Sequence, residues 1–581
     1  MSKSHRSSAP SIAAYYDDRM LTEVIRLHSA VDAARLPLEI GDVEPLRARR
    51  QEILEQLGDY VIPRLMAREA PLLCVVGGST GAGKSTLVNT LVGTPVSPAG
   101  VLRPTTRSPV LVHHPDDAEW FSADQLLPDL RRVKEEAHDQ STIQLVPAET
   151  VPAGLAILDA PDVDSVEQAN RHLAGELLGA ADLWLFVTSA ARYADQVPWD
   201  YLRQAAERST AVAIVLDRTP DDAVDYISTH LARMLASRGL RDSPLFRVAE
   251  GELDEQGLLP ADHVAEVRQW LEALAADAGA KGAVVEQTLS GAVRTLTRKL
   301  HPLADATEEQ RAAGEELASL ARRRHDATED ALATALRDGT LLTGDLFARW
   351  QEFLGSGELI HGLEGKVGFV RERLRNAIRG KPQQAERVEI ALTQAVGALV
   401  TEYAERASAD VVDAWRETSY VALEPGGSLT RASTDLRRRA TSTVRGWQDD
   451  VQQMVRDHSG DLASSARFLT FGVRGLAAAL SVTALARDGA PEPARESTEL
   501  GRRLLDSVFG QELATQLLDR ARDALRARVH TVFDGERGRY ESVITEWGLT
   551  AEAAEQLRQA VRRVDDLRFS AQHDPLGGPK K

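Results

Sequence analysis

Residues 77–86 read GGSTGAGKST, and the part at 78–85 fits the phosphate-binding pattern G-x-x-x-x-G-K-[ST] in full. Glycines let a backbone wrap around a phosphate with its N–H groups directed inward, and a helix that follows places its positive end at the same anion. An apolar, strand-like run precedes this stretch at 71–76, and apolar residues with helical spacing follow it at 87–92. This context favours a P-loop over a glycine-rich turn that precedes a helix by chance.

The residue types in the loop predict separate roles at a bound nucleotide. Lys84 is expected to bridge the β- and γ-phosphates and to act in catalysis, Ser85 to offer its hydroxyl to Mg²⁺, and Thr86 to approach the α-phosphate. The remaining predicted nucleotide-binding residues form the loop itself; they are Gly78, Ser79, Thr80, Gly81, Ala82 and Gly83.

Two further segments contain candidates for the metal site. Asp159 ends the apolar run at 155–158, where a carboxylate could hold Mg²⁺ through a water molecule, although aspartates are also common where a strand passes into a loop. Between the P-loop and this strand, residues 103–109 read RPTTRSP. Thr106, or alternatively Thr105, could close over Mg²⁺ and the γ-phosphate through its hydroxyl and backbone. A polar surface loop is the other interpretation of this segment.

The segment from about 71 to 275 alternates strand-like and helix-like stretches. Its short apolar runs lie at 71–76, 109–113, 156–158, 183–187 and 211–216. Alternation of this kind predicts an α/β fold with a mostly parallel sheet and helices on both faces. We therefore assign 71–275 to a P-loop domain.

Most of the rest of the chain has helical periodicity. With 581 residues, the chain is too long for one hydrophobic core and suggests two or three domains. Residues 1–70 read as a Ser-rich start followed by two amphipathic helices, and 283–460 as the long helices of a trunk. Residues 461–581 combine an apolar segment, further helices and a short polar tail from Gln572.

Composition and charge disfavour several classes of protein. A formal net charge of -18 repels nucleic-acid phosphates, and no helix combines base-reading side chains with a basic face, so we expect no nucleic-acid partner. The single cysteine, Cys74, lies in an apolar run, which indicates a buried, inert thiol in a reducing cytoplasm. Residues 1–10 lack the apolar core of a signal peptide.

Together, the P-loop, the TRSP segment at 106–109, the DAP segment at 159–161 and the flanking helical zones resemble the bacterial dynamin-like GTPases, particularly the actinobacterial ones. The resemblance implies hydrolysis of GTP with Mg²⁺, a neck formed by the helices that flank the GTPase domain, and a helical trunk with a membrane-contacting tip. It also implies a homodimer formed through the GTPase domain, with a related paralogous chain as a second candidate partner, and the remodelling or bridging of membranes. The expected location is the cytoplasm, at the inner face of the cell membrane.

The sequence departs from the family pattern beside the γ-phosphate. Asp162 replaces the glycine of D-x-P-G, which normally gives a backbone N–H to that phosphate, so hydrolysis is expected to be slow. Thr80 stands at the P-loop position where dynamins carry a catalytic Gln. These two departures favour an alternative function, a nucleotide-binding scaffold that hardly hydrolyses its ligand.

The guanine-reading motif N/T-K-x-D is also degraded, because the residues after the run at 211–216 read DRTPD. Arg218 could stack on the base, and Asp217 or Asp221 could accept hydrogen bonds from guanine N1 and N2. ATP remains the alternative nucleotide. A soluble ABC-type ATPase would need an LSGGQ signature and a Walker B strand that ends in an Asp-Glu pair. Here Ala160 follows Asp159, the aspartate at the end of the strand.

Two segments are candidates for contact with an anionic membrane surface. Residues 468–486 form an apolar stretch with Arg474 inside, which suits either a membrane-dipping tip or a buried core helix. Residues 347–382 place aromatics on one helical side and a basic run after them, which suits a lipid surface or a solvated helix with its aromatics inside the trunk. The apolar residues are Phe347, Trp350, Phe353 and Leu354, and the basic ones are Lys366, Arg371, Arg373, Arg375, Arg379 and Lys381.

Overall fold

The computed structural model describes most of the chain. It covers residues 18–98, 108–122, 127, 130–135, 141–165, 168–208, 210–220, 222–339, 341–355, 371–422, 427–460, 466–485 and 492–573, with the backbone alone at 371–380, 466–467, 492–494 and 571–573. The chain folds into two compact units. The first comprises Met1–Leu36, Asp42–Glu308 and Thr550–Lys581, and the second Pro37–Gly41 and Glu309–Leu549.

The first unit contains an eight-stranded sheet with the order β3-β4-β2-β5-β1-β6-β7-β8. Neighbouring strands are parallel, except that β2 and β5 pair antiparallel with Val110 opposite Asp159. The strands are β1 Leu72–Gly78, β2 Val110–His113, β3 Arg131–Val133, β4 Thr142–Pro147, β5 Leu155–Asp159, β6 Leu183–Ser189, β7 Ala211–Thr219 and β8 Leu245–Ala249. The mostly parallel sheet confirms the predicted α/β fold, and β1, β2, β5, β6 and β7 coincide with the predicted apolar runs.

Helices cover both faces of this sheet, as the alternating pattern predicted. Leu73 and Val75 of β1 belong to one hydrophobic core, and Leu72, Cys74 and Val76 to the other. The first core is covered by α6 Gln168–Gly179, α7 Gln196–Arg208 and α8 Val224–Ser237, and the second by α4 Lys84–Val92 and α9 Ala265–Ala276. A short 3-10 turn, η3 Pro115–Asp117, and α5 Ala118–Ser122 follow β2. Because both faces are buried, the central strands are apolar at consecutive positions.

The buried thiol predicted in β1 is confirmed. Cys74 is 0% exposed and is a free cysteine. Burial in an apolar environment raises its pKa to about 12, so the side chain stays an uncharged thiol at neutral pH.

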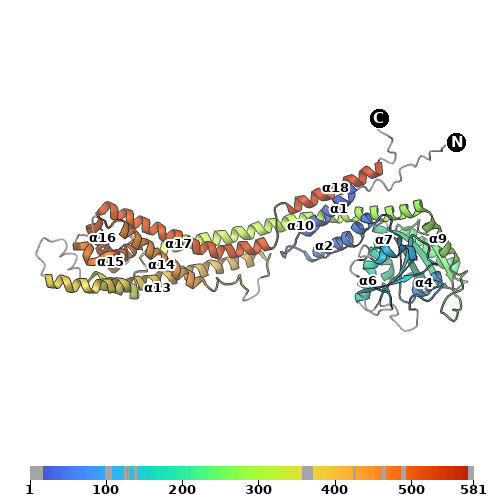
Figure 1. Cartoon of the computed structure of the whole chain (residues 1–581), viewed down its shortest axis with the longest axis horizontal. Coiled ribbons are helices and arrows are strands. Elements are labelled where there is room, and N and C mark those ends of the chain that lie inside the picture. Colours follow the sequence, from blue (N-terminus) through green and yellow to red (C-terminus); the bar gives the residue numbers. More distant parts are fainter. Residues whose placement is uncertain are drawn as a thin grey trace, which may run out of the picture. The chain divides into compact units, whose positions relative to one another are not determined.

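The first unit also contains a helical bundle formed by segments from both ends of the chain (Figure 1). Helices α1 and α18 lie along each other and along α10, and Val24, Leu300 and Leu557 of these helices are each 0% exposed in one shared core. Helix α10 is 58 residues long, and only its part up to Glu308 belongs to this unit. The elements are α1 Asp18–Ala33, α2 Glu44–Gln56, the π-helical turn η2 Leu57–Val61, α3 Ile62–Met66, α10 Ala278–Ala335 and α18 Ala553–His573.

The second unit is built from long helices, which confirms the predicted helical trunk. Its core contains three tryptophans, Trp350, Trp415 and Trp447, each 0% exposed. The indole N–H of Trp447 donates to the Ala521 carbonyl oxygen at 2.8 Å, so this polar atom is satisfied inside the core. Besides the later part of α10, the helices are α11 Gly344–Leu354, α13 Arg371–Thr418, α14 Leu436–Asp457, α15 Ala466–Leu485, α16 Glu492–Phe509 and α17 Gln511–Glu546.

Helix α15 contains the first membrane candidate. In the described part of the chain, Phe468–Leu485 is the one helical window that is long and apolar enough to cross a membrane, and 78% of it is buried in the protein. Leu476 and Leu480 are each 0% exposed in the core of the second unit. Arg474, the charge within the stretch, donates from Nε to Glu389 Oε2 at 2.7 Å. This packing supports the core-helix interpretation of 468–486, of which position 486 lies outside the described residues.

The aromatic side of the second membrane candidate, 347–382, also packs inside. Trp350 and Phe353 of α11 are 0% exposed, and their rings stack with centroids 5.6 Å apart. Lys381 is 4% exposed, and its ammonium donates to the Phe353 carbonyl oxygen. The assignment of Lys381 to a basic lipid-binding surface was therefore wrong, because α13 directs this side chain into the core. The other basic side chains of the run lie outside the described residues.

Candidate functional site

The P-loop joins the carboxyl end of β1 to the amino end of α4, as the motif predicted. The two motif glycines adopt backbone angles that favour glycine, with φ of 147° at Gly78 and 101° at Gly83. At Gly78 the missing side chain also lets β1 approach β6, because a Cβ there would lie 2.0 Å from the carbonyl oxygen of Val187. The shape of the loop therefore depends on glycine at both motif positions.

Lys84 begins α4, and its side chain folds back over the loop. Its Nζ donates a hydrogen bond to the Ser79 carbonyl oxygen at 3.1 Å and forms an ion pair with Asp162 Oδ1. Only 5% of the lysine side chain and 16% of the aspartate side chain are exposed. The ammonium group thus contacts an anion, and that anion comes from the position at which the family pattern has glycine.

Asp159, at the end of β5, lies next to Ser85, the other predicted magnesium ligand of the described residues. Its Oδ2 accepts hydrogen bonds from Ser85 Oγ at 2.6 Å and from Ser97 Oγ at 2.5 Å, and the residue is 0% exposed. Burial raises the pKa of Asp159, while the two serine hydroxyls and Lys84 oppose this shift. Sequence reasoning missed Ser97, because a single serine in a loop carries no pattern.

This arrangement fits Mg²⁺ bound together with a nucleotide. Asp159 Oδ1 is buried and has no hydrogen-bond partner among the described residues, which is costly for a carboxylate oxygen. A carboxylate and a hydroxyl are oxygen ligands of the kind that Mg²⁺ takes, together with water and phosphate oxygens. The described ranges contain no group of three or more His, Cys, Asp or Glu side chains that could hold a metal ion on its own.

Asp164 connects the P-loop to the segment after β6, which sequence reasoning did not anticipate. Its Oδ1 accepts hydrogen bonds from the Thr80 backbone N–H at 2.6 Å and from Thr80 Oγ1 at 2.7 Å. Its Oδ2 accepts one from a terminal guanidinium nitrogen of Arg192 at 3.1 Å. The residue at the position of the dynamin Gln is therefore held by a carboxylate. The only sequence signal was the alternation of acids in DAPDVD at 159–164.

The candidates for reading the base lie at the end of β7, beside the P-loop. Asp217 is 2% exposed, and a Cβ at Gly83 would come within 1.9 Å of its Oδ2. Its Oδ1 accepts a hydrogen bond from the Arg218 backbone N–H at 2.8 Å. Arg218 has a φ of 48°, which is uncommon for a residue other than glycine, and its Nε is 3.7 Å from the same Cβ position. Contact of these residues with a base stays a prediction.

The remaining predicted site residues lie outside the described residues. These are Thr106 with its alternative Thr105, and Asp221. Their roles at Mg²⁺, at the γ-phosphate and at the base stay predictions.

Replacing Asp217 with asparagine is expected to stabilise the nucleotide-free protein at neutral pH. Burial raises the pKa of Asp217 from 3.8 to about 6. The folded protein therefore keeps a proton that the unfolded chain releases, and the stability associated with it is present below about pH 4 and lost as pH rises through about 6. The loss amounts to roughly 2–3 kcal/mol. Thermal unfolding of both proteins between pH 4 and 8 should show stabilities that converge towards about pH 4, move apart up to about pH 6 and keep that separation above it. The same separation at every pH would contradict the expectation.

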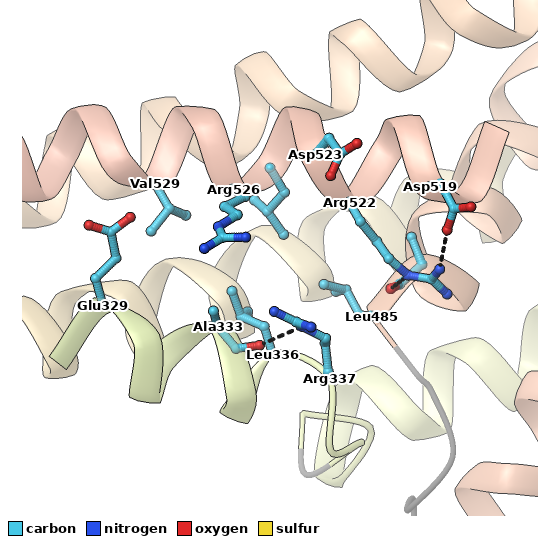
Figure 2. A pocket seen from close by; sticks show the side chains of 12 residues that line it. Glu329, Ala333, Leu336, Arg337, Leu485, Asp519, Arg522, Asp523, Arg526 and Val529 are labelled. Carbon is cyan, nitrogen blue, oxygen red and sulfur yellow. Dashed lines mark hydrogen bonds and ion pairs between the residues drawn. The ribbon is translucent and has the colours of Figure 1, made fainter. Parts of the chain in front are cut away.

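A separate cavity of about 420 Å³ lies within the second unit, between α10, α15 and α17 (Figure 2). Leu336, Leu485 and Val529 give it apolar walls, and charged side chains surround its rim. At one end Arg522 forms an ion pair with Asp519 at 2.8 Å. No residue of the P-loop motif lines this cavity, so it is not part of the nucleotide site.

A mostly parallel sheet with a P-loop after β1, a lysine over that loop and an aspartate hydrogen-bonded to the motif serine define a P-loop nucleotide-binding domain. The family model described as the dynamin family matches residues 74–217, and this segment of the chain belongs to that family. The dynamin-like resemblance is thereby confirmed for the nucleotide-binding domain, while an actinobacterial origin stays a prediction.

Two solved structures of an oligomerised bacterial dynamin pair, described as providing a mechanism for the long-range sensing and tethering of membranes, are similar to the chain. One has a TM-score of 0.35 and 10% sequence identity, and the other a TM-score of 0.33 and 12% identity. Each comparison covers 99% of this chain and 96% of the other. No curated protein sequence matches the chain.

Proposed function

We propose that this protein is a dynamin-like GTPase that binds and hydrolyses GTP with Mg²⁺. One observation carries the proposal: Lys84 folds over the P-loop while Ser85, the next residue, is hydrogen-bonded to the buried Asp159. These are the residue types that hold a triphosphate and its cation in P-loop hydrolases. The dynamin-family match of residues 74–217 supports the same class of reaction.

Catalysis in this proposal consists of positioning and charge neutralisation. The inward N–H groups of the P-loop hold the phosphates, and Lys84 balances the charge between the β- and γ-phosphates. Ser85 and Asp159 would hold Mg²⁺, which when bound neutralises charge on the phosphate oxygens. Thr106 is the proposed residue that closes over this site. Water then attacks the γ-phosphate in line with the leaving oxygen.

The base specificity is proposed from the end of β7. Arg218 Nε lies 3.7 Å from the position that a Cβ would take at Gly83. In this proposal Arg218 stacks on guanine, and Asp217 or Asp221 accepts hydrogen bonds from the N–H groups of the base. Affinities for GTP and ATP measured side by side test this part, and tighter binding of ATP would overturn it.

Nucleotide state is proposed to act on the helices through α10. Within the first unit, Thr288 of α10 donates to the Asp182 carbonyl oxygen at 2.9 Å and accepts a hydrogen bond from the Ala211 N–H at 3.1 Å. Two turns of this helix further on, Thr295 donates to the Glu207 carbonyl oxygen at 2.8 Å. A change in the sheet or in α7 therefore reaches α10 directly, and we propose that movement of the helical trunk follows.

Assembly is proposed from the family assignment. The chain would form a homodimer through its GTPase domain, or pair with a related paralogous chain. It would lie in the cytoplasm and associate peripherally with the anionic inner face of the cell membrane. The basic run within 347–382 is the remaining candidate surface, with Lys381 removed from it.

Replacing Lys84 with alanine is expected to weaken GTP binding on the order of 10²-fold, because the charge-assisted contacts of its ammonium group to the phosphates are lost. Equilibrium binding of a fluorescent GTP analogue in the presence of Mg²⁺ measures this. Lys134, an exposed lysine of the same unit, provides the control variant Lys134→Ala. If the wild-type chain binds no nucleotide, or if the Lys84 variant binds as well as the control, the proposed function is wrong.

A nucleotide-binding scaffold that hardly hydrolyses GTP is a second candidate, favoured by the Asp162 carboxylate beside Lys84. Single-turnover hydrolysis, with and without liposomes containing anionic lipid, separates the two functions. The GTPase should convert its bound GTP, faster with liposomes, whereas a scaffold should keep the GTP intact in both conditions. Sedimentation of the protein with the same liposomes tests membrane association.

A further inference from the structure

Residues 162–164, which we call the acidic strap, contact the P-loop at three points. Asp162 forms the ion pair with Lys84, and Asp164 accepts both hydrogen bonds from Thr80. Between them, the Val163 N–H donates to the Gly78 carbonyl oxygen at 3.4 Å. Val163 is 0% exposed, so the strap is fixed at its centre by burial as well as by hydrogen bonds.

The Asp162 carboxylate contacts the Lys84 ammonium group, which the β- and γ-phosphates of a nucleotide need. An ammonium group has three donors, and in this structure one points to the Ser79 carbonyl oxygen and another to the Asp162 carboxylate. A β- or γ-phosphate oxygen would have to take the place of that carboxylate. Because both are anions and the pair is largely shielded from water, they would repel each other strongly if both stayed.

The anchors of the strap keep the carboxylate close to the lysine. Asp164 is held by Thr80 on one side and by Arg192 on the other, and Val163 is buried beside β1. Because the next two residues of the chain are fixed in this way, Asp162 stays close to Lys84. Attachment of this kind gives a group a high effective concentration, so the ion pair reforms readily whenever it breaks.

We propose that Asp162 is a built-in competitor for the nucleotide, which occupies Lys84 in the free protein and must leave before a phosphate can bind. The proposal rests on the proposed function, and it makes Asp162 the residue that sets the affinity of the phosphate site. The apparent affinity equals the intrinsic affinity multiplied by the fraction of free molecules in which Lys84 is available. If that fraction is about one in ten, the measured Kd is about tenfold weaker than the intrinsic one.

The test replaces Asp162 with asparagine, and in a second variant with glycine, which is the residue of the family pattern. Stopped-flow binding of a fluorescent GTP analogue with Mg²⁺ gives the association and dissociation rates separately. Because the competitor acts on the free protein, the association rate should rise about tenfold in both variants, and the dissociation rate should change less than about twofold. Asp242→Asn, at an exposed aspartate of the same unit, is the charge-matched control and should leave both rates unchanged.

The outcomes separate this proposal from the proposed function. Binding by the wild-type chain with unchanged rates in both Asp162 variants would overturn the competitor role and leave the GTPase intact. A gain of affinity that comes entirely from slower dissociation would also overturn it, since Asp162 would then repel the nucleotide within the complex. If neither the wild-type chain nor the variants bind nucleotide, the proposed function fails and the competitor role fails with it.

Discussion

Replacing Gly78 with alanine is expected to abolish nucleotide binding and to lower the free energy of unfolding of the first unit by roughly 2–5 kcal/mol. Gly78 has a φ of 147°, which side chains rarely allow, and a Cβ would lie 2.0 Å from the Val187 carbonyl oxygen. Gly78 and Val187 are partners in the β1–β6 register, so the atom that must move is backbone of a central strand. The strands would separate where the P-loop begins.

Gly93 provides the matched control for this substitution. It ends α4 with a φ of 80°, and a Cβ there would meet nothing within 4 Å. Gly93→Ala should therefore show the backbone strain alone, roughly 1 kcal/mol, and keep its nucleotide. Thermal unfolding and binding of a fluorescent GTP analogue compare the two variants. Equal effects would mean that the close approach of β1 to β6 is not what makes Gly78 necessary.

Replacing Asp182 with asparagine is expected to destabilise the first unit by about 3–5 kcal/mol, because it leaves the Arg64 charge buried without its counterion. Arg64 Nε lies 3.0 Å from Asp182 Oδ1, and the side chains are 1% and 2% exposed. Asp182 Oδ2 also accepts a hydrogen bond from the Leu73 N–H at 2.9 Å. The pair thereby ties α3 to the start of β1, at the end of the strand away from the P-loop.

The ion pair is tested by denaturant unfolding of Asp182→Asn, of Arg64→Met and of the double variant. Each single variant should lose several kcal/mol, and the double variant much less than the sum, because no lone charge remains buried. The exposed pair of Arg203 and Asp200, 3.2 Å apart, gives the control Asp200→Asn, which should cost less than about 1 kcal/mol. Additive losses in the double variant would show that Arg64 and Asp182 act separately.

The strands that the sequence predicted are those buried on both faces. β1, β5, β6 and β7 lie in the interior of the sheet, where both faces are covered, so each contains an uninterrupted apolar run. β3, β4 and β8 were missed, because they lie at or near the sheet edges and keep polar or half-exposed residues. The antiparallel pairing of β2 with β5 could not be predicted either, because a run of apolar residues does not indicate whether the neighbouring strand is parallel or antiparallel.

The P-loop was predictable because its chemistry is local. Gly78, Gly83, Lys84 and Ser85 lie within one turn and the start of one helix, and the spacing of the motif alone defines the backbone that they need. The proposed role of Asp159 at Mg²⁺ followed from its place at the end of an apolar strand. The acidic strap did not, because its contacts to Lys84 and Thr80 join residues about 80 positions apart in the chain.

By itself, the sequence determined a P-loop α/β domain, the helical character of the other regions and the residues predicted to bind a phosphate. Each of these depends on the spacing and periodicity of residues close together in the chain. Only the tertiary structure decided which apolar helix becomes core, as with α15, and which charges become buried partners, as with Lys381 and the Arg64–Asp182 pair. It also decided that α1 and α18, from opposite ends of the chain, share one hydrophobic core. The physical reason is that a pattern along the chain shows which face of an element is apolar, whereas the surface that covers that face comes from residues far away in the sequence.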